Sequence, residues 1–215
     1  MRFWNSTIGK KIVVALTGLI MFVFVIGHLL GNLQVFLGAR AFNEYADFLH
    51  NGTHGLLWVA RAVLLVSIVL HIVATVQLTR RNRASRSIPY AQHTTIQATT
   101  PSLFMIWSGV FLGLYILYHL THLTFGWTLP GFNHRNVYAN VALGFPWPVA
   151  LLYVLGMVAL GFHLHHGISS MFQTLGLNHP KYNRLRRGFA VGASIAIAGG
   201  YSLIPLSVLV RIIRL

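Results

Sequence analysis

The chain has 215 residues, of which 55% are hydrophobic and only 8% carry a charge, whereas a soluble domain has about 25% charged residues. Together with a mean hydropathy of +0.66, this composition excludes a soluble globular protein and a disordered one. The sequence contains no cysteine, which excludes a disulfide, an iron–sulfur cluster and a covalently attached haem.

The charge of the chain is strongly positive. Sixteen Lys and Arg stand against only two acids, Glu44 and Asp47, which gives a formal net charge of +14. In a membrane protein this balance indicates contact with anionic lipid or with another protein. No basic helix with base-reading side chains is visible, so we do not expect nucleic acid as a partner.

Five windows are apolar enough and long enough for a membrane span, which needs about 20 mostly apolar residues. In chain order they cover residues 12–39, 56–79, 102–129, 147–173 and 188–210. The first window is too long for the apolar part of a cleaved signal peptide, so we expect it to be a retained span. No repeat and no second domain are visible. We therefore predict a single all-α domain over residues 1–215, a bundle of five transmembrane helices in the cell membrane.

The distribution of basic residues predicts how the bundle is inserted. Eleven of the sixteen Lys and Arg lie before the first window, between windows two and three, or between windows four and five. The positive-inside rule places the N-terminus in the cytoplasm and the C-terminus outside, although Arg211 and Arg214 then lie on the disfavoured side. The polar, basic stretch 80–101 is a candidate for a short amphipathic connector on the cytoplasmic side.

Histidine carries most of the functional information, because ionisable side chains inside a bilayer are costly. Five of the twelve His lie in loops or at span ends and are expected to be solvated or interfacial: His50, His54, His93, His134 and His179. Seven lie inside the windows: His28, His71, His119, His122, His163, His165 and His166. The windows hold no Asp or Glu to pair with these seven, so a metal-binding role is favoured over simple burial.

The depth of four of these side chains follows from a rise of about 1.5 Å per residue. His28 and His119 lie about 24 and about 26 Å above the cytoplasmic ends of their spans. His71 and His163 lie about 12 and about 15 Å above theirs. The four therefore form an outer pair, His28 with His119, and an inner pair, His71 with His163. Two stacked metal centres, each bound from two helices, would need this arrangement.

Two imidazoles are too few for zinc, which takes three or four protein ligands. They suit the two axial positions of a haem iron, and without cysteine that haem is of the non-covalent b type. Such a centre has no free position for a substrate and only transfers electrons. Spacing leaves His122 open as an alternative to His119, and His166 as an alternative to His163, because each shares a helix face with its neighbour. His165 points in roughly the opposite direction.

Glycines near these side chains would leave room for a porphyrin between helices. Small residues at this spacing are also common where helices simply pack together, so both interpretations stay open. The glycines are Gly27 and Gly31 around His28, Gly109 and Gly113 before His119, and Gly161 and Gly167 around His163.

Several motifs support a resemblance to a known family. The N-terminal motifs are Ser6-Thr7-Ile8-Gly9-Lys10-Lys11, Ala15-Leu16-Thr17-Gly18, Gly27-His28-Leu29-Leu30-Gly31-Asn32-Leu33, Gly38 and Ala41-Phe42-Asn43-Glu44-Tyr45. With its five spans, the chain over nearly its whole length resembles the di-haem cytochrome b membrane-anchor subunit of succinate:quinone oxidoreductases, the succinate dehydrogenases and fumarate reductases.

The resemblance implies which His are ligands. In that family the third-span ligand lies in an aromatic-His-aliphatic triplet, which Tyr118-His119-Leu120 matches. The fourth-span ligand precedes two glycines at fixed distances, which His163, Gly167 and Gly176 match. The family pattern thus implies the ligand set His28, His71, His119 and His163.

The resemblance also implies a function and partners. The chain is not expected to be an enzyme by itself, but a subunit with two haem b that exchanges electrons with a membrane quinone, menaquinone by analogy with the di-haem branch. The implied partners on the cytoplasmic side are a flavoprotein and an iron–sulfur protein, for which the basic residues would form a docking face.

Some relatives carry an intramembrane Glu near the fourth-span ligand. Its absence here argues against a carboxylate proton path.

Further residues are candidates for the cofactor pocket. Arg61 near the outer haem, and Arg81 or Arg187 near the inner one, are candidates to pair with haem propionates, with simple anchoring at the membrane surface as the alternative. Thr17 is a candidate to face the inner haem, although a Thr in a span often bonds to its own helix.

The quinone candidates lie at both ends of the first span. Asn32 and Gln34 are candidates at the outer end, and Trp4 and Lys10 at the inner end. For Lys10 the favoured interpretation is a cation that snorkels to the membrane surface or faces lipid.

Two other functions stay open from the sequence. A cytochrome b subunit of a hydrogenase or a formate dehydrogenase also uses His in a small helical bundle. A haem-free transporter that moves protons through His would be expected to show broken helices or intramembrane acids, which this sequence lacks.

Overall fold

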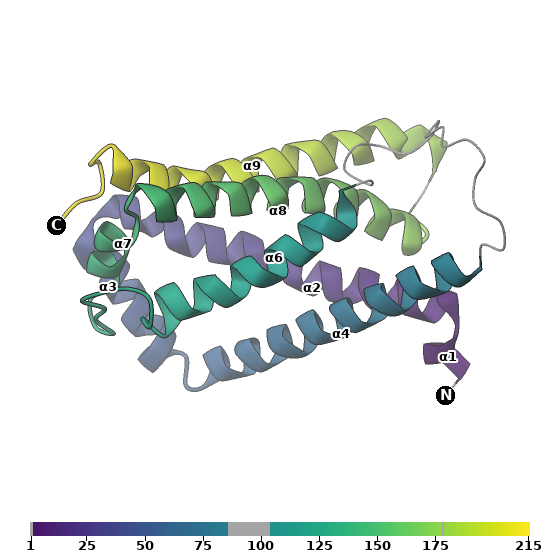
Figure 1. Cartoon of the computed structure of the whole chain (residues 1–215), viewed down its shortest axis with the longest axis horizontal. Helices are drawn as coiled ribbons and strands as arrows, with labels where there is room; N and C mark the ends of the chain where they lie inside the picture. Colours follow the sequence, from purple (N-terminus) through teal and green to yellow (C-terminus); the bar gives the residue numbers. More distant parts are fainter. Residues whose placement is uncertain (1, 86–103, 178) are drawn as a thin grey trace.

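The computed structural model describes residues 2–85, 104–177 and 179–215. In these ranges the chain is helical and has no strand, which confirms the predicted fold class. Five helices are long and apolar enough to cross a membrane, and they form one elongated bundle (Figure 1). They are α2 (Thr7–Leu33), α4 (Leu56–Ala84), α6 (Met105–His119), α8 (Trp147–Thr174) and α9 (Asn183–Leu209).

The first span begins and ends earlier than its apolar window. The Ser6 hydroxyl accepts a hydrogen bond from the Gly9 amide at 2.8 Å, which caps α2. At its other end α2 passes into a 3₁₀ turn, Gln34–Leu37, and Gly38 then turns the chain with φ +96°, a value that favours glycine. The expected end at residue 39 is therefore too late.

The third span ends at residue 124 and not at 129 as expected. After His119, α6 continues as one π-helical turn, Leu120–Thr124, and Gly126 then takes up φ +70°. Residues 125–129 are apolar, but they belong to the turn that leaves the bundle. The expected start at residue 102 lies outside the described residues.

Two further helices extend beyond their apolar windows, because hydropathy does not decide where a helix begins or ends. α4 continues from the expected end at residue 79 to Ala84, since Arg and Ala favour helix in water as well as in lipid. α9 begins at Asn183, five residues before its apolar window. α4 thus includes the start of the predicted connector, whose residues 86–101 lie outside the described part of the chain.

The two ends of the bundle differ (Figure 1). At the N-terminal end lie α1 (Arg2–Asn5), the last turns of α4 and the 3₁₀ turn η4 (Pro180–Tyr182). Together with the first turns of α2 and α9, these segments carry the Lys and Arg expected on the cytoplasmic side, apart from Arg86, which is outside the described residues. The described loop and span-end His, His50, His54, His134 and His179, are exposed as expected, whereas His93 is not described.

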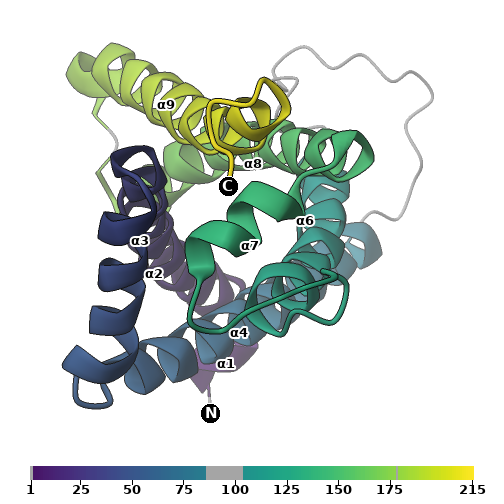
Figure 2. The same cartoon turned by 90° about the vertical axis from the view of Figure 1, so that its left-hand side faces the viewer.

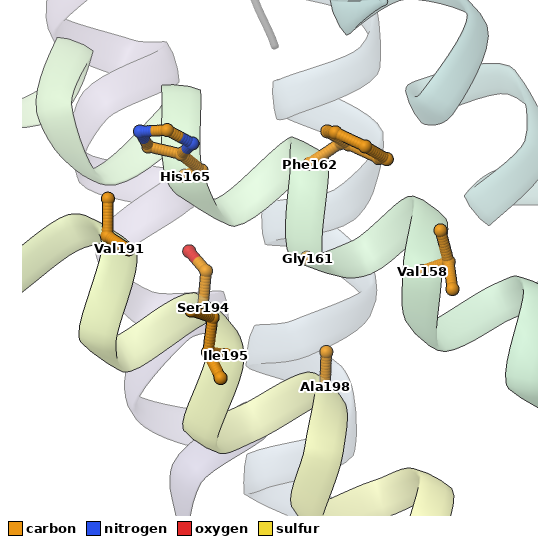
Figure 3. Close-up of a pocket in the computed structure, with 8 residues that line it drawn as sticks. All are labelled: Val158, Gly161, Phe162, His165, Val191, Ser194, Ile195 and Ala198. Atoms are coloured by element: carbon orange, nitrogen blue, oxygen red, sulfur yellow. The ribbon is translucent and has the colours of Figure 1, made fainter.

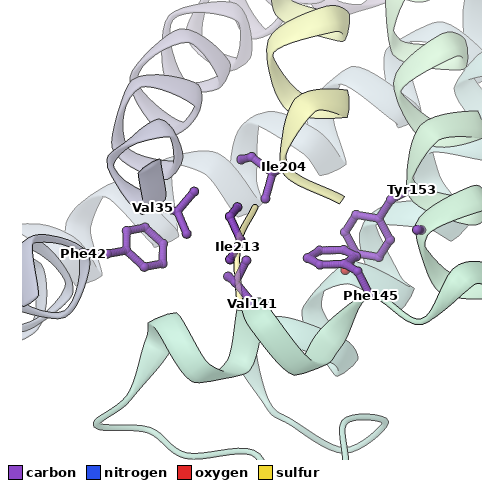
Figure 4. Packing of buried hydrophobic residues seen from close by; sticks show 8 residues of the cluster. Val35, Phe42, Val141, Phe145, Tyr153, Ile204 and Ile213 are labelled. Atoms are coloured by element: carbon purple, nitrogen blue, oxygen red, sulfur yellow. The ribbon is translucent and has the colours of Figure 1, made fainter. Parts of the chain in front are cut away.

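The opposite end is closed by two short helices that the sequence analysis did not predict, α3 (Ala39–Asp47) and α7 (Val137–Gly144). Figure 2 shows α7 lying across this end of the bundle. The amide of Asn43 in α3 donates to Asn136 Oδ1 at 3.1 Å, and its oxygen accepts from the Tyr138 amide at 3.0 Å. A buried cluster fills the space beneath (Figure 4): Val35, Phe42, Val141, Phe145, Ala150, Tyr153, Ile204 and Ile213.

α9 packs along α8 and against α2. It has no His and was expected only to close the bundle. A second buried cluster joins these three helices: Phe22, Leu29, Ile168, Ala190 and Ile197. The Tyr201 hydroxyl on α9 also donates to the Val25 carbonyl on α2 at 2.7 Å, so α9 is tied to the first span at mid-length.

Candidate functional site

Four of the seven intramembrane His come together as two pairs. The rings of His28 on α2 and His119 on α6 have their centroids 6.1 Å apart, with their planes at 84°. The rings of His71 on α4 and His163 on α8 are 6.4 Å apart, at 56°. These are the two pairs that the depth estimate and the family pattern had indicated, and their role as ligands stays a prediction.

Both separations suit one metal ion between two rings. Two imidazoles that each bind a metal at about 2 Å from opposite sides have their ring centres about 6 Å apart. Among the residues that the structure describes, no group of three or more His, Cys, Asp or Glu could hold a metal ion. The histidine pairs, each with two ligand atoms, therefore fit an iron whose other ligands come from a porphyrin.

The two pairs lie at two levels of the bundle, and α2 and α6 carry residues at both levels. The Thr17 hydroxyl lies 3.1 Å from Nδ1 of His71, and the Ser108 hydroxyl lies 3.4 Å from Nδ1 of His163. Thr17 precedes His28 by eleven residues on α2, as Ser108 precedes His119 on α6. Eleven residues are about three helical turns, or about 16 Å along the axis. One face of α2 and one face of α6 therefore serve both levels.

The hydroxyls at the first level indicate where the paired rings carry their protons. Thr17 donates to the Val13 carbonyl at 2.7 Å, and Ser108 donates to the Met105 carbonyl at 3.1 Å. With its only proton used, each hydroxyl accepts from the ring nitrogen it faces. His71 and His163 then carry hydrogen at Nδ1 and keep the lone pair of Nε2 for a metal, as metal-binding His usually do.

At the second level, the neighbours of His28 are an amide and two aromatic rings, and not a hydroxyl. Nδ2 of Asn32 lies 3.3 Å from Nδ1 of His28 and donates to the His28 carbonyl at 2.6 Å. The rings of Phe24 and Tyr201 flank the same imidazole, with centroids 5.2 and 6.0 Å away. Asn32, a quinone candidate from the sequence, is thus in contact with a predicted ligand.

Helix spacing left open whether His119 or His122 pairs with His28, and the tertiary structure distinguishes the two. His119 faces His28, stacks on Tyr115 at 6.0 Å, and has its Nδ1 3.3 Å from the Tyr153 hydroxyl. His122 is only 1% exposed and stacks on Tyr118 at 5.4 Å. Only His119 is therefore placed to share a metal with His28.

The three His of α8 also differ in their surroundings. His163 pairs with His71, whereas His165 lines a groove between α8 and α9 of about 240 Å³ (Figure 3). The groove walls are mostly apolar, formed by residues such as Phe162 and Ile195, and it contains none of the paired His. His166 is half-buried, and among the described residues its ring is not paired with another aromatic ring.

Some of the glycines leave space beside the His pairs, and others allow helices to pack closely. A Cβ on Gly109 would lie 3.5 Å from Cε1 of His163, and a Cβ on Gly18 would lie 3.6 Å from Cε1 of His71. Gly27, Gly113 and Gly167 have no atom within 4 Å of that position, so space is open beside both pairs. The other two expected glycines serve helix packing: Gly31 makes room for the ring of Tyr45, and Gly161 packs on Ala198.

Two of the three arginine candidates contact other residues near the ends of the bundle. The Arg61 guanidinium lies 4.7 Å from the centre of the Trp58 ring. Nη1 of Arg81 donates to the Asn5 carbonyl at 2.6 Å, and Arg187 is exposed. Pairing of these side chains with haem propionates stays a prediction.

Lys10 does not face lipid, so the interpretation favoured from the sequence is wrong. Its side chain is only 2% exposed. Its Nζ donates to the Trp4 carbonyl and lies 5.3 Å from the centre of the Trp4 ring. The short α1 folds back over α2 and covers Lys10. Gln34, the remaining quinone candidate, is half-buried in the 3₁₀ turn after α2.

These features define a multi-pass helical membrane protein with two levels of paired His in its interior. A family model described as "Succinate dehydrogenase/Fumarate reductase transmembrane subunit" matches residues 77–200, more than half of the chain. The chain belongs to this family. The match includes His119 and His163, and it favours this family over the hydrogenase and formate dehydrogenase alternatives. No curated protein and no solved structure matches the chain.

Proposed function

We propose that the chain is the membrane-anchor cytochrome b subunit of a succinate:quinone oxidoreductase and passes electrons between an iron–sulfur subunit and menaquinone. His28 with His119, and His71 with His163, are the proposed axial ligands of an outer and an inner haem b. The observation that carries the proposal is the pair of ring separations, 6.1 and 6.4 Å, on helices of a family of respiratory membrane subunits.

When bound, a haem with two axial His supplies one-electron transfer and no bond chemistry. The residues of this chain hold the cofactor and set its surroundings. The hydroxyl groups of Thr17, Ser108 and Tyr153 lie at Nδ1 of three imidazoles and orient them, and the rings of Phe24 and Tyr201 flank the fourth, His28. The apolar helices around them keep water from the pairs. The chain is thus proposed to have no catalytic residue of its own.

The proposed orientation places the N-terminal end of the bundle in the cytoplasm. The segments rich in Lys and Arg gather at that end, as the positive-inside rule requires. The flavoprotein and iron–sulfur subunits would dock there, closest to the His71–His163 pair. Arg81 and Arg187 at this end, and Arg61 at the other, are the proposed propionate partners.

Quinone exchange is proposed at the ends of the first span. Trp4 and Lys10 would serve a site at the cytoplasmic end, and Asn32 and Gln34 a site at the outer end. Because Asn32 contacts His28, a quinone bound there would lie next to the outer haem.

The proposal is tested by counting haems in the gently purified complex. We expect two b-type haems per chain in the reduced-minus-oxidised spectrum. His163→Leu should remove the inner haem and His28→Leu the outer one. The matched control is His165→Leu, two residues from His163 on the same helix, which should retain both. A colourless complex that still contains its partner subunits, or a His163→Leu complex with both haems, would refute the proposal.

A further inference from the structure

One hydroxyl connects a predicted ligand to a buried His that the proposed function does not use. Tyr153 on α8 is 5% exposed. Its hydroxyl lies 3.3 Å from Nδ1 of His119 and 2.8 Å from Nδ1 of His122. Each of the two rings thus presents the same nitrogen to one oxygen.

The His122 ring is closely packed on several sides. Its ring stacks on Tyr118 at 5.4 Å and meets the edge of Phe145 at 5.9 Å. The backbone of Gly144 in α7 closes the remaining side, where an added Cβ would lie 3.5 Å from Nε2 of His122. A polar ring that is 1% exposed needs hydrogen-bond partners, because an unpaired buried polar group is costly. Tyr153 is the partner at Nδ1.

Counting protons gives the direction of the hydrogen bonds. A His119 that binds a metal through Nε2 carries its hydrogen at Nδ1 and needs an acceptor there. The oxygen of Tyr153 is within reach, and its own proton then needs a different acceptor. Nδ1 of His122, at the shorter distance of 2.8 Å, is that acceptor. His119 therefore donates to Tyr153, and Tyr153 donates to His122.

We propose that Tyr153, held by His122, is a positioning residue that fixes the Nδ1–H form of His119 and lowers the midpoint potential of the outer haem. An acceptor at Nδ1–H makes an imidazole a more basic ligand, and a more basic ligand favours ferric iron. The proposal rests on the proposed function, since it needs His119 as an iron ligand. It goes beyond that function in giving a role to His122 and in assigning to Tyr153 an effect on the midpoint potential.

The first test compares two hydroxyl deletions beside the same imidazole in the purified complex. Tyr153→Phe removes the acceptor and keeps the ring. At a fixed ambient potential we expect the ratio of ferrous to ferric outer haem to rise about tenfold, which corresponds to 59 mV for a one-electron couple. The inner haem should keep its midpoint. Tyr115→Phe is the matched control, because the Tyr115 ring stacks on His119 but its hydroxyl has no bond to His119 among the described residues.

The second test changes the far end of the hydrogen-bonded chain. His122→Leu leaves the Tyr153 proton without its acceptor and should also raise the outer midpoint. His122→Asn, whose side-chain oxygen can accept near the position of Nδ1, should restore it. This comparison decides the question if Tyr153→Phe does not retain the outer haem.

The results separate this inference from the proposed function. Two haems with an unchanged outer midpoint in both Tyr153→Phe and His122→Leu would overturn the inference and leave the function intact. An equal shift in Tyr115→Phe would also overturn it. A wild-type complex without haem, or a His119→Leu complex that keeps both haems, would instead overturn the function.

Discussion

The Thr17 hydroxyl donates to its own helix at Val13 and lies 3.1 Å from Nδ1 of His71. Ser108 on α6 has the same relationship to His163. The first level of the site is therefore nearly symmetric, with one aliphatic hydroxyl beside each ring. The second level is not, because an amide faces His28 and a phenol faces His119. This difference gives the two proposed haems unequal surroundings.

Thr17→Val removes the hydroxyl beside His71 and keeps the shape of the side chain. We expect a higher midpoint of the inner haem and weaker haem retention, since losing such a partner costs about 10- to 100-fold in metal affinity. A redox titration of the purified complex measures the midpoint, and haem content after washing measures retention. Thr17→Ser keeps the hydroxyl and should behave like the wild type; an equal effect of both substitutions would contradict the role given to the hydroxyl.

Gly156→Ala tests the packing of α8 against α6. An added Cβ would lie 2.7 Å from the Tyr115 ring, too close without a shift, and overpacking of this kind costs about 1–3 kcal/mol. We expect a lower Tm of the complex in detergent. Gly192→Ala on α9 is the control, because its Cβ would have no atom within 4 Å. Equal Tm values for the two variants would show that the Tyr115 contact is not tight.

Lys10→Met tests the contact that holds α1 on α2. The substitution leaves the Trp4 carbonyl without the Nζ donor, which costs about 1–3 kcal/mol when a buried acceptor loses its partner. Faster hydrogen exchange of the amides in residues 2–5 is the expected result. The control is Lys11→Met, since the neighbouring Lys11 is exposed. If exchange is unchanged in Lys10→Met, this bond does not hold α1 in place.

Asn43→Ala tests the closure of the end formed by α3 and α7. It removes both the hydrogen bond to Asn136 and the one from the Tyr138 amide. At about 1 kcal/mol for each bond, the loss should increase hydrogen exchange in α7. The control Asn51→Ala removes an exposed bond to Asp47 and should leave α7 unaffected. Equal exchange of α7 in the two variants would contradict the role of Asn43.

Local properties of the sequence were enough for the spans and for the levels of the His. The window 147–173 coincides with α8, Trp147–Thr174, because transfer of an apolar segment into lipid depends on its own composition. The pairing of the first span with the third followed from depth, because an α-helix has a constant rise per residue, and the family pattern implied His119. Hydropathy alone failed at residues 125–129, where the backbone of Gly126, and not apolar character, ends the third span.

By itself, then, the sequence determined that the chain is a bundle of apolar helices with paired imidazoles at two depths, because lipid solubility and helical rise are properties of single segments. The tertiary structure alone decided that α1 covers Lys10, and that Tyr153 lies between the imidazoles of His119 and His122. Each of these depends on how one helix is rotated against another. That rotation is set by the packing of many side chains at once, so no single segment encodes it.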